Sequence, residues 1–279
     1  MRQVISASRR TELPMRFPHW LAQVIEEGQV EVPLPYTGQT RLVSLRAEDV
    51  HSIVLWSKDF SPLLADEGGL RQALARYDQL FCHLTITGLG GSPLEPNIPP
   101  WARIIEQLAE LMEFVGHPRR VAVRFDPIIH WREHGEMKSN FPLAGEILGR
   151  CASYGVRTIR ISFATLYGKV RRRKGWEWYD PPLTERLRMV RELVSLAEPL
   201  GLTIYACSDH SLQEAGVRPS RCIDGELLAE LHPQHLPAQT CKDSGQRPEC
   251  GCTPSVDIGS YTMRCPNGCR YCYANPVIP

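Results

Sequence analysis

Residues 120–126 read RVAVRFD, and this stretch carries the two properties on which the fold prediction depends. Its β-branched and aromatic residues predict a strand. Successive strand residues point to opposite faces, so the two valines and Phe125 share an apolar face, whereas Arg124 and Asp126 share the other. One face is suited to packing against helices, and the other predicts a polar interior.

The same pattern recurs along the chain. Five further stretches predict strands that alternate with predicted helices: residues 4–8, 52–57, 81–87, 158–163 and 202–207. This alternation indicates parallel βαβ units. We therefore expect an α/β fold, a (β/α) barrel or partial barrel of about six parallel strands, with an open doubly wound sheet as the alternative. Residues 30–50 and the stretch around His130 and His134 are predicted as loops.

A polar face is also expected in the other strands, where His83 and Arg160 lie on it. Ordinary barrels fill their interior with bulky branched side chains, whereas a polar interior requires a polar ligand or water. We interpret the polar face as the inside of the barrel. The candidate catalytic residues are Arg124, Asp126, His83 and Arg160. The alternative for Arg124 and Asp126 is a buried ion pair that only stabilises the barrel.

Composition limits the function classes. The chain has 279 residues and a formal net charge of +1, so no global field favours nucleic acid or an acidic membrane. No apolar run approaches membrane-spanning length, and the N-terminus lacks the apolar core of a signal peptide. We expect a cytoplasmic protein.

The chain changes character after residue 207. We divide it into a barrel domain, 1–207, and a cysteine-rich extension, 208–279, which packs on the barrel mouth. Most of the 10 cysteines lie toward this end, and clustered cysteines without a secretion signal are better interpreted as metal ligands than as disulfides. Residues 255–261 predict a weak seventh strand that delivers Cys265 to the mouth.

The extension ends in a cysteine motif, CPNGCRYCY at residues 265–273. Its C-x3-C-x2-C spacing is able to hold three corners of an iron–sulfur cube and leave the fourth iron without a protein ligand. A zinc ribbon would need two C-x2-C knuckles instead. We therefore favour a [4Fe-4S] cluster on Cys265, Cys269 and Cys272 over zinc.

This motif, with Tyr271 just before its third cysteine, resembles the signature of radical S-adenosylmethionine (radical SAM) enzymes. The chain also resembles an uncharacterised family that carries the motif at its C-terminus. The similar segments are ISASRRTELP, residues 5–14, and QRPECGCTPSVDIGSYTMRCPNGCRYCYAN, residues 246–275.

The resemblance implies that S-adenosylmethionine (SAM) binds the fourth iron. Reductive cleavage of SAM would yield methionine and a 5′-deoxyadenosyl radical that abstracts hydrogen from a substrate, here a small polar or anionic molecule. An electron donor such as flavodoxin or ferredoxin is implied as a partner. Tyr271 would lie beside the adenine, and Ser8, Arg9 and Arg10 occupy the place of the usual SAM-binding segment. Thr87, at the carboxyl end of its strand, is a further candidate for cofactor binding.

The position of the motif departs from the usual radical SAM order, in which it follows the first barrel strand. Here it ends the chain. If residues 255–261 lie beside residues 4–8, the fold is a circular permutation whose cut falls after the cluster loop.

Four other cysteines suggest a second site. Cys207, Cys222, Cys250 and Cys252 form a candidate set for an auxiliary [4Fe-4S] cluster, with Cys241 as a competitor for one place. The alternatives are structural zinc on the same ligands, or plain buried thiols for Cys207 and Cys222.

The basic and aromatic loop at residues 169–179 could bind phosphates and stack on bases. We favour a solvated loop or contact with an anionic small molecule, because the net charge is near zero. A zinc-stabilised α/β binding protein, with nucleic acid as its ligand, is the alternative to the enzyme hypothesis.

Overall fold

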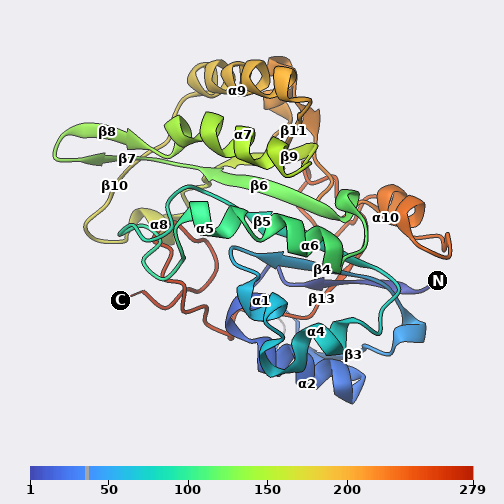
Figure 1. Ribbon diagram of the computed structural model, residues 1–279. Coiled ribbons are helices and arrows are strands. Elements are labelled where there is room, and N and C mark those ends of the chain that lie inside the picture. The colour runs from blue at the N-terminus through green and yellow to red at the C-terminus, as the bar shows by residue number, and fades with distance from the viewer. Residues whose placement is uncertain (35–37, 279) are drawn as a thin grey trace.

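The computed structural model describes residues 1–34 and 38–278, and its centre is an eight-stranded sheet (Figure 1). Every hydrogen-bonded pair in this sheet is parallel. In spatial order the strands are β12 (Arg218–Pro219), β11 (Thr203–Ala206), β9 (Thr158–Phe163), β6 (Val121–Ile128), β5 (Leu80–Thr85), β4 (Val50–Ser57), β1 (Gln3–Ala7) and β13 (Val256–Asp257).

This strand order confirms an α/β fold with a large parallel sheet. All six predicted main strands are present, and the weak seventh strand corresponds to β13. Each strand lies beside its neighbour in sequence, except that the last strand, β13, lies beside the first. Apart from β13, the strands follow one another in a single direction across the sheet. This order is compatible with a partial barrel, and among the described residues β12 and β13 are edge strands that do not close it.

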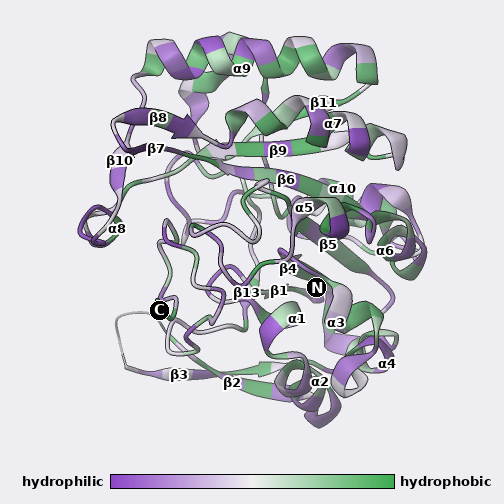
Figure 2. Ribbon diagram, turned by 60° about the vertical axis from the view of Figure 1, so that its left-hand side comes forward, coloured by the Kyte–Doolittle hydropathy of each residue, from purple (hydrophilic) through white to green (hydrophobic). Residues whose placement is uncertain are grey.

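Helices cover the outer face of the sheet on both sides of β6 (Figures 1 and 2). The longer ones are amphipathic, and α9 in Figure 2 carries both hydrophilic and hydrophobic residues along its length. The helices are α1 (Leu13–Arg16), α2 (Pro18–Glu27), α3 (Ser61–Leu64), α4 (Leu70–Leu74), α5 (Trp101–Ile105), α6 (Leu108–Phe114), α7 (Ala144–Ser153), α8 (Gly168–Arg171), α9 (Leu183–Ala197) and α10 (Gly225–Leu231).

The two faces of the sheet have separate apolar clusters. The larger cluster joins the outer face to the helices, and in β6 it contains Val123 and Phe125, both fully buried. The smaller cluster lies on the inner face and includes Val54 and Phe81 together with Leu228 of α10. His83 lies two residues after Phe81, and Arg124 two residues after Ala122 of the same cluster, so both polar side chains share this face. The polar face is therefore the inner one, as the strand pattern predicts.

The segment around α10 lies against the amino-terminal ends of the strands. The Gln79 side-chain amide, just before β5, donates to the Leu228 carbonyl at 2.8 Å. His51, near the start of β4, contacts the Leu236 carbonyl at 2.9 Å, and Arg119, before β6, pairs with Glu230. Residues beyond 208 thus cover the base of the sheet with α10 and supply an edge strand with β13.

Two predicted loops are hairpins instead. β2 (Gln29–Pro33) pairs with β3 (Thr40–Ser44) within the stretch predicted as irregular, of which residues 35–37 lie outside the described residues. β7 (His130–Glu133) pairs with β8 (Glu136–Ser139) and with β10 (Glu177–Tyr179) in a separate three-stranded sheet. The β7–β8 hairpin turns at His134 and Gly135, which both have positive φ. In both hairpins strand pairing outweighed the local turn and loop signals.

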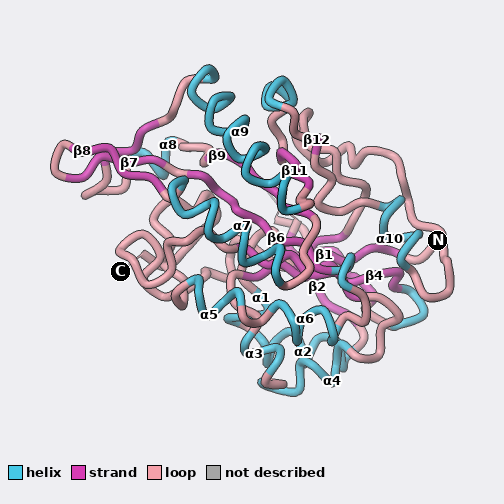
Figure 3. The backbone as a smooth tube through the Cα atoms, turned by 45° about the horizontal axis from the view of Figure 1, so that its top comes forward, coloured by secondary structure: helices cyan, strands magenta, loops and turns pink. Residues whose placement is uncertain are grey.

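The N-terminus and the C-terminus lie at opposite ends of the sheet along the strand direction (Figures 1 and 3). β1 starts at the N-terminal side, so the parallel strands run toward the side where the C-terminus lies. In the described part of the chain no helix is both long and apolar enough to cross a membrane.

Replacing Leu55 with alanine tests the outer core. Leu55 lies in β4 and is fully buried among helix residues, so the substitution should lower the free energy of unfolding by about 2–5 kcal/mol. Leu42 in β3 is 61% exposed, and its replacement with alanine should change that free energy by less than about 0.5 kcal/mol. Urea unfolding measures both, and equal effects would contradict the assigned packing.

Candidate functional site

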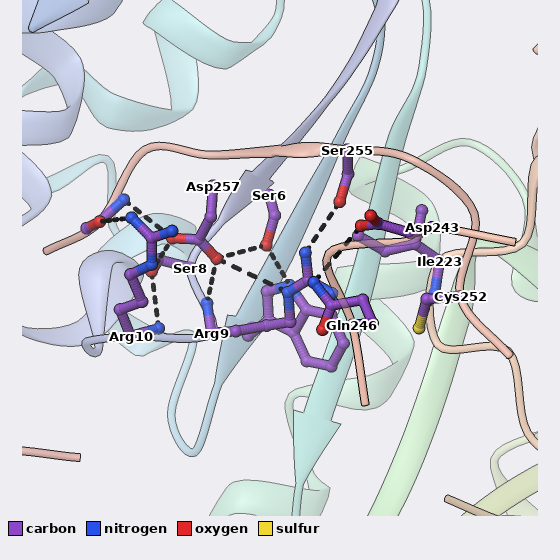
Figure 4. A network of polar contacts seen from close by, with 12 residues as sticks. Ser6, Ser8, Arg9, Arg10, Ile223, Asp243, Gln246, Cys252, Ser255 and Asp257 are labelled. Carbon is purple, nitrogen blue, oxygen red and sulfur yellow. Dashed lines mark hydrogen bonds and ion pairs between the residues drawn. The ribbon is translucent and has the colours of Figure 1, made fainter. Parts of the chain in front are cut away.

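The C-terminal segment is attached to the first strand through β13. Ile5 of β1 is in register with Val256, and Ser6 with Asp257. The Asp257 carboxylate, which is 8% exposed, accepts hydrogen bonds from the Ser6 hydroxyl at 2.9 Å and the Ser8 hydroxyl at 2.6 Å. It also accepts hydrogen bonds from the backbone N–H groups of Arg9 at 2.7 Å and Gly259 at 3.0 Å (Figure 4). One buried carboxylate thus joins the two ends of the chain.

The predicted SAM-contacting residues after β1 have protein partners. The Arg9 guanidinium donates to the Ser255 hydroxyl at 2.8 Å, and Arg10 donates to the Gly259 carbonyl at 3.3 Å. Together with Ser8, these side chains bind the segment that leads to the cysteine motif (Figure 4). One buried nitrogen of Arg9, Nη1, has no hydrogen-bond partner.

The cysteine motif lies over loops at the carboxyl ends of the strands. The Thr11 hydroxyl, after β1, donates to the Met263 carbonyl at 2.8 Å. The loop after β5 contributes two contacts: the Asn97 amide donates to the Pro266 carbonyl at 2.8 Å, and the Leu94 carbonyl accepts the N–H of residue 270 at 3.0 Å. Ligands of parallel α/β proteins gather at this edge of the sheet.

A buried carboxylate connects the motif to the predicted Thr87. Glu95, 1% exposed, accepts hydrogen bonds from the Thr87 hydroxyl at 2.8 Å, from Lys58 Nζ at 3.0 Å and from the Tyr271 hydroxyl. The Lys58 ammonium also lies 5.7 Å from the Tyr271 ring centre. Burial opposes the charge on Lys58, but Glu95 and the thiol of Cys269 raise its pKa.

The three motif cysteines lie close enough to influence one another electrostatically. Cys269 is buried, and Cys265 and Cys272 are partly exposed. Burial raises the pKa of the Cys265 thiol to about 12 and raises those of the other two. Across the described residues, no three His, Cys, Asp or Glu side chains already surround one point as ligands of a single ion.

The basic loop after β9 contacts the backbone of the motif. Arg173 donates to the Cys272 carbonyl at 2.7 Å and to the carbonyl of residue 270, and Lys169 donates to the Ala274 carbonyl at 3.1 Å. Two of the cations predicted for a solvated loop therefore bind the cysteine segment.

An acidic side chain after β1 lies beside the motif. Glu12 is partly buried, and the loss of solvent around its carboxyl raises its pKa to about 7. Its Oε2 accepts the Lys58 N–H at 3.3 Å, whereas its Oε1 has no hydrogen-bond partner. The Glu12 charge also raises the pKa of Cys265. A buried carboxylate oxygen without a donor is costly, so this position is suited to a ligand that donates a hydrogen bond.

The four candidate catalytic residues lie on the inner face. Arg124 pairs with Asp126 and is in register with Arg160 of β9. Asp126 also accepts the Ser162 hydroxyl. Burial and the Arg160 charge lower the pKa of His83 well below its usual value, and its Nε2 contacts the Cys222 carbonyl at 2.7 Å. These residues are brought together. His83, Arg124 and Arg160, however, lie beside Cys222 of the second cysteine set and not beside the C-terminal motif.

The second predicted cysteine set also comes together. The sulfurs of Cys207 and Cys222 are 3.6 Å apart, and the Cys252 thiol interacts with those of Cys222 and Cys250. Cys241, the predicted competitor, is exposed.

The comparisons with known proteins identify a family. A family model described as a domain of unknown function (DUF1848) matches residues 4–274. The chain belongs to the DUF1848 family. The search of curated proteins gives no match to it.

Solved structures similar to this DUF1848 chain include a D-hydantoinase from a Bacillus sp. AR9, with 13% identity and a TM-score of 0.35 over 80% of this chain and 50% of that one. Another is the carboxyl transferase domain of Rhizobium etli pyruvate carboxylase, with 10% identity and a TM-score of 0.29 over 84% and 43%. The DUF1848 chain thus spans half or less of these solved chains.

Three site residues of this DUF1848 protein were missed by sequence reasoning. Asp257 lies in the predicted weak strand, and its pairing with the serines of β1 is visible only once the two strands are adjacent. Glu12 and Arg173 lie in segments that the sequence did single out, residues 5–14 and 169–179, but nothing in the local pattern distinguished these two residues from their polar neighbours.

Replacing Asp257 with alanine should loosen the attachment of the motif. The change leaves two backbone N–H groups and two hydroxyls without their acceptor, and should lower the free energy of unfolding by about 1–3 kcal/mol. Hydrogen exchange should show faster exchange in residues 256–272, whereas β9 keeps its protection. Asp49, an exposed carboxylate that accepts the Ser44 hydroxyl at 2.6 Å, provides the control variant Asp49→Ala. Unchanged exchange in residues 256–272 would contradict the anchoring role.

Proposed function

We propose that this DUF1848 protein is a radical SAM enzyme built on a circularly permuted partial barrel. Cys265, Cys269 and Cys272 would hold a [4Fe-4S] cluster, and SAM would bind its open iron. When bound, this pair supplies a 5′-deoxyadenosyl radical that abstracts hydrogen from a polar or anionic substrate. The observation that carries the proposal is the parallel pairing of β13 with β1, which leads directly into the C-x3-C-x2-C loop at the carboxyl edge of the sheet.

The residues around the loop fit a three-thiolate cluster. Three thiolates bring negative charge to this site, and the Lys58 ammonium lies between Cys269 and Glu95, where it opposes that charge. Arg173 and Lys169 donate to carbonyls of the loop backbone and fix its conformation. Both contacts are made to backbone carbonyls, so they leave the three thiols of the loop available as ligands.

The residues also fit the amino-acid portion of SAM. Glu12 Oε1 is a buried acceptor without a donor, next to Cys265, and an N–H of the methionyl amine would provide one. Arg9 Nη1 is a buried donor without an acceptor, suited to a carboxylate. The side chains of Ser8 and Arg10 would act indirectly, because they hold the segment around Gly259. In this proposal Tyr271 is oriented by Glu95 for contact with the adenine.

In this proposal the polar groups of the inner face would contact the substrate. Asp126 and Ser162 lie toward the carboxyl ends of β6 and β9, and Arg124 neutralises Asp126. These groups favour a small polar molecule over a long apolar one. Electron delivery would come from a flavodoxin or ferredoxin.

Metal analysis and product formation test this function. Anaerobically reconstituted protein should be brown, contain iron and sulfide in equal amounts, and release 5′-deoxyadenosine when reduced with SAM. Cys269→Ala should abolish that release, because the cluster loses one of its three ligands. Cys241→Ala, which removes an exposed thiol, should leave release unchanged. Protein without iron and sulfide after reconstitution would refute the proposal and favour the zinc-stabilised binding protein.

Glu12→Gln tests the SAM-binding role separately. The variant should keep its iron and sulfide, since Glu12 is not a cluster ligand. It should bind SAM about 10- to 100-fold more weakly, because a hydrogen bond to a charged group contributes roughly 1.5–3 kcal/mol. Equilibrium binding of SAM to the unreduced protein measures this change. Wild-type affinity in the variant would exclude Glu12 from the SAM site.

A further inference from the structure

The inner face holds a second group of sulfurs, separate from the motif. Cys207 follows β11, Cys222 follows β12, and Cys250 and Cys252 precede β13. Three of these residues are buried, and Cys207 is partly exposed. The sulfurs of Cys207 and Cys222 are 3.6 Å apart. Three distant chain segments therefore bring their thiols to one place inside the sheet.

Hydrogen-bond donors point at these sulfurs. The Arg124 guanidinium donates to the Cys222 sulfur at 2.8 Å. The backbone N–H of Ile223 donates to the Cys252 sulfur at 3.4 Å, and Figure 4 shows both residues where the C-terminal segment passes the sheet. Donors directed at sulfur are typical of thiolates bound to metal, whose remaining lone pairs accept such bonds.

Two buried arginines leave positive charge to be balanced. Arg124 and Arg160 are 9% and 5% exposed. Asp126 pairs with Arg124, whereas Nε and Nη1 of Arg160 are buried without hydrogen-bond partners. A buried cation without a counter-charge is costly. Four thiolates around a divalent ion carry a net charge of −2, which opposes the charge of these arginines.

The sulfur separation favours a single ion. In a tetrahedral site with Zn–S bonds of about 2.3 Å, neighbouring sulfurs are about 3.8 Å apart, close to the separation of Cys207 and Cys222. In a cube each thiolate binds a different iron, so the sulfurs lie farther apart. Thiolate ligands also select zinc among the abundant divalent ions. The Cys250 and Cys252 side chains have to turn toward the common centre before all four thiolates bind one ion.

We propose that Cys207, Cys222, Cys250 and Cys252 bind one structural Zn²⁺ inside the partial barrel. The ion joins β11, the segment after β12 and the segment before β13, and so closes the sheet where its two edge strands do not pair. The arginines Arg124 and Arg160 act as its counter-charges, and His83 holds the Cys222 backbone. This site does not depend on the radical SAM proposal, because it shares no ligand with the motif.

The test uses full-length protein in which Cys265, Cys269 and Cys272 are all replaced by alanine, so that metal at the motif does not interfere. Anaerobically purified protein should retain about one zinc per chain. X-ray absorption should give four sulfur ligands at about 2.3 Å. In this background Cys222→Ala should reduce zinc at least tenfold, whereas Cys151→Ala, which removes a buried thiol of α7, should retain it.

Iron with sulfide in this background would overturn the single-ion proposal in favour of an auxiliary cluster. Absence of any bound metal would also overturn it. If Cys222→Ala prevents folding, a second measurement tests the site instead. Co²⁺ is substituted for zinc in the protein that lacks Cys265, Cys269 and Cys272, and its visible spectrum should show the ligand-field bands of tetrahedral cobalt thiolate. Octahedral cobalt bands, or none, would contradict the proposal. Failure of the radical SAM function is seen separately, as loss of iron and sulfide from protein with the motif intact.

Discussion

The hydrogen bonds that the buried Asp257 carboxylate accepts at the carboxyl end of β1 are the interaction on which the candidate site depends. Asp257 binds the hydroxyls of Ser6 and Ser8 and the N–H groups of Arg9 and Gly259. A pairing of only two residues in β13 is weak by itself, and these bonds fix its register. The space is also tight, because a Cβ on Gly259 would lie 2.1 Å from the Ser8 hydroxyl. The cysteine motif begins six residues later.

The side chains on the inner face of the sheet change in character from the amino ends of the strands to their carboxyl ends. Apolar residues such as Val54 and Phe81 pack against Leu228 of α10 near the amino ends of the strands. Cysteines and arginines follow, and the motif with Lys58 and Glu95 lies at the carboxyl ends. The chain beyond residue 208 contacts all of these levels. Residues beyond 208 therefore pack on the inner face of the sheet, whereas the helices before them pack on the outer face.

Sequence periodicity predicted most of the fold, because the strands alternate between an apolar outer face and a polar inner face. Phe125 and Arg124 show that alternation directly. The hairpins at β2–β3 and β7–β8 were not predicted. Val30, Val32 and Val43 of β2 and β3 are buried in the main core, but the proline and glycine residues around them indicated an irregular segment. Among site residues, the cysteine spacings were informative. Asp257 and Glu12 were not, because their roles depend on neighbours from the other end of the chain.

The central claim is that the C-terminal motif holds a cluster whose open iron binds SAM beside Glu12. It is tested most directly by electron–nuclear double resonance on the reduced wild-type protein, frozen with SAM that carries ¹⁵N in its methionyl amine. The account predicts a ¹⁵N hyperfine coupling to the cluster, which shows that the amine binds the iron. A reduced cluster whose spectrum shows no such coupling at saturating SAM would contradict it.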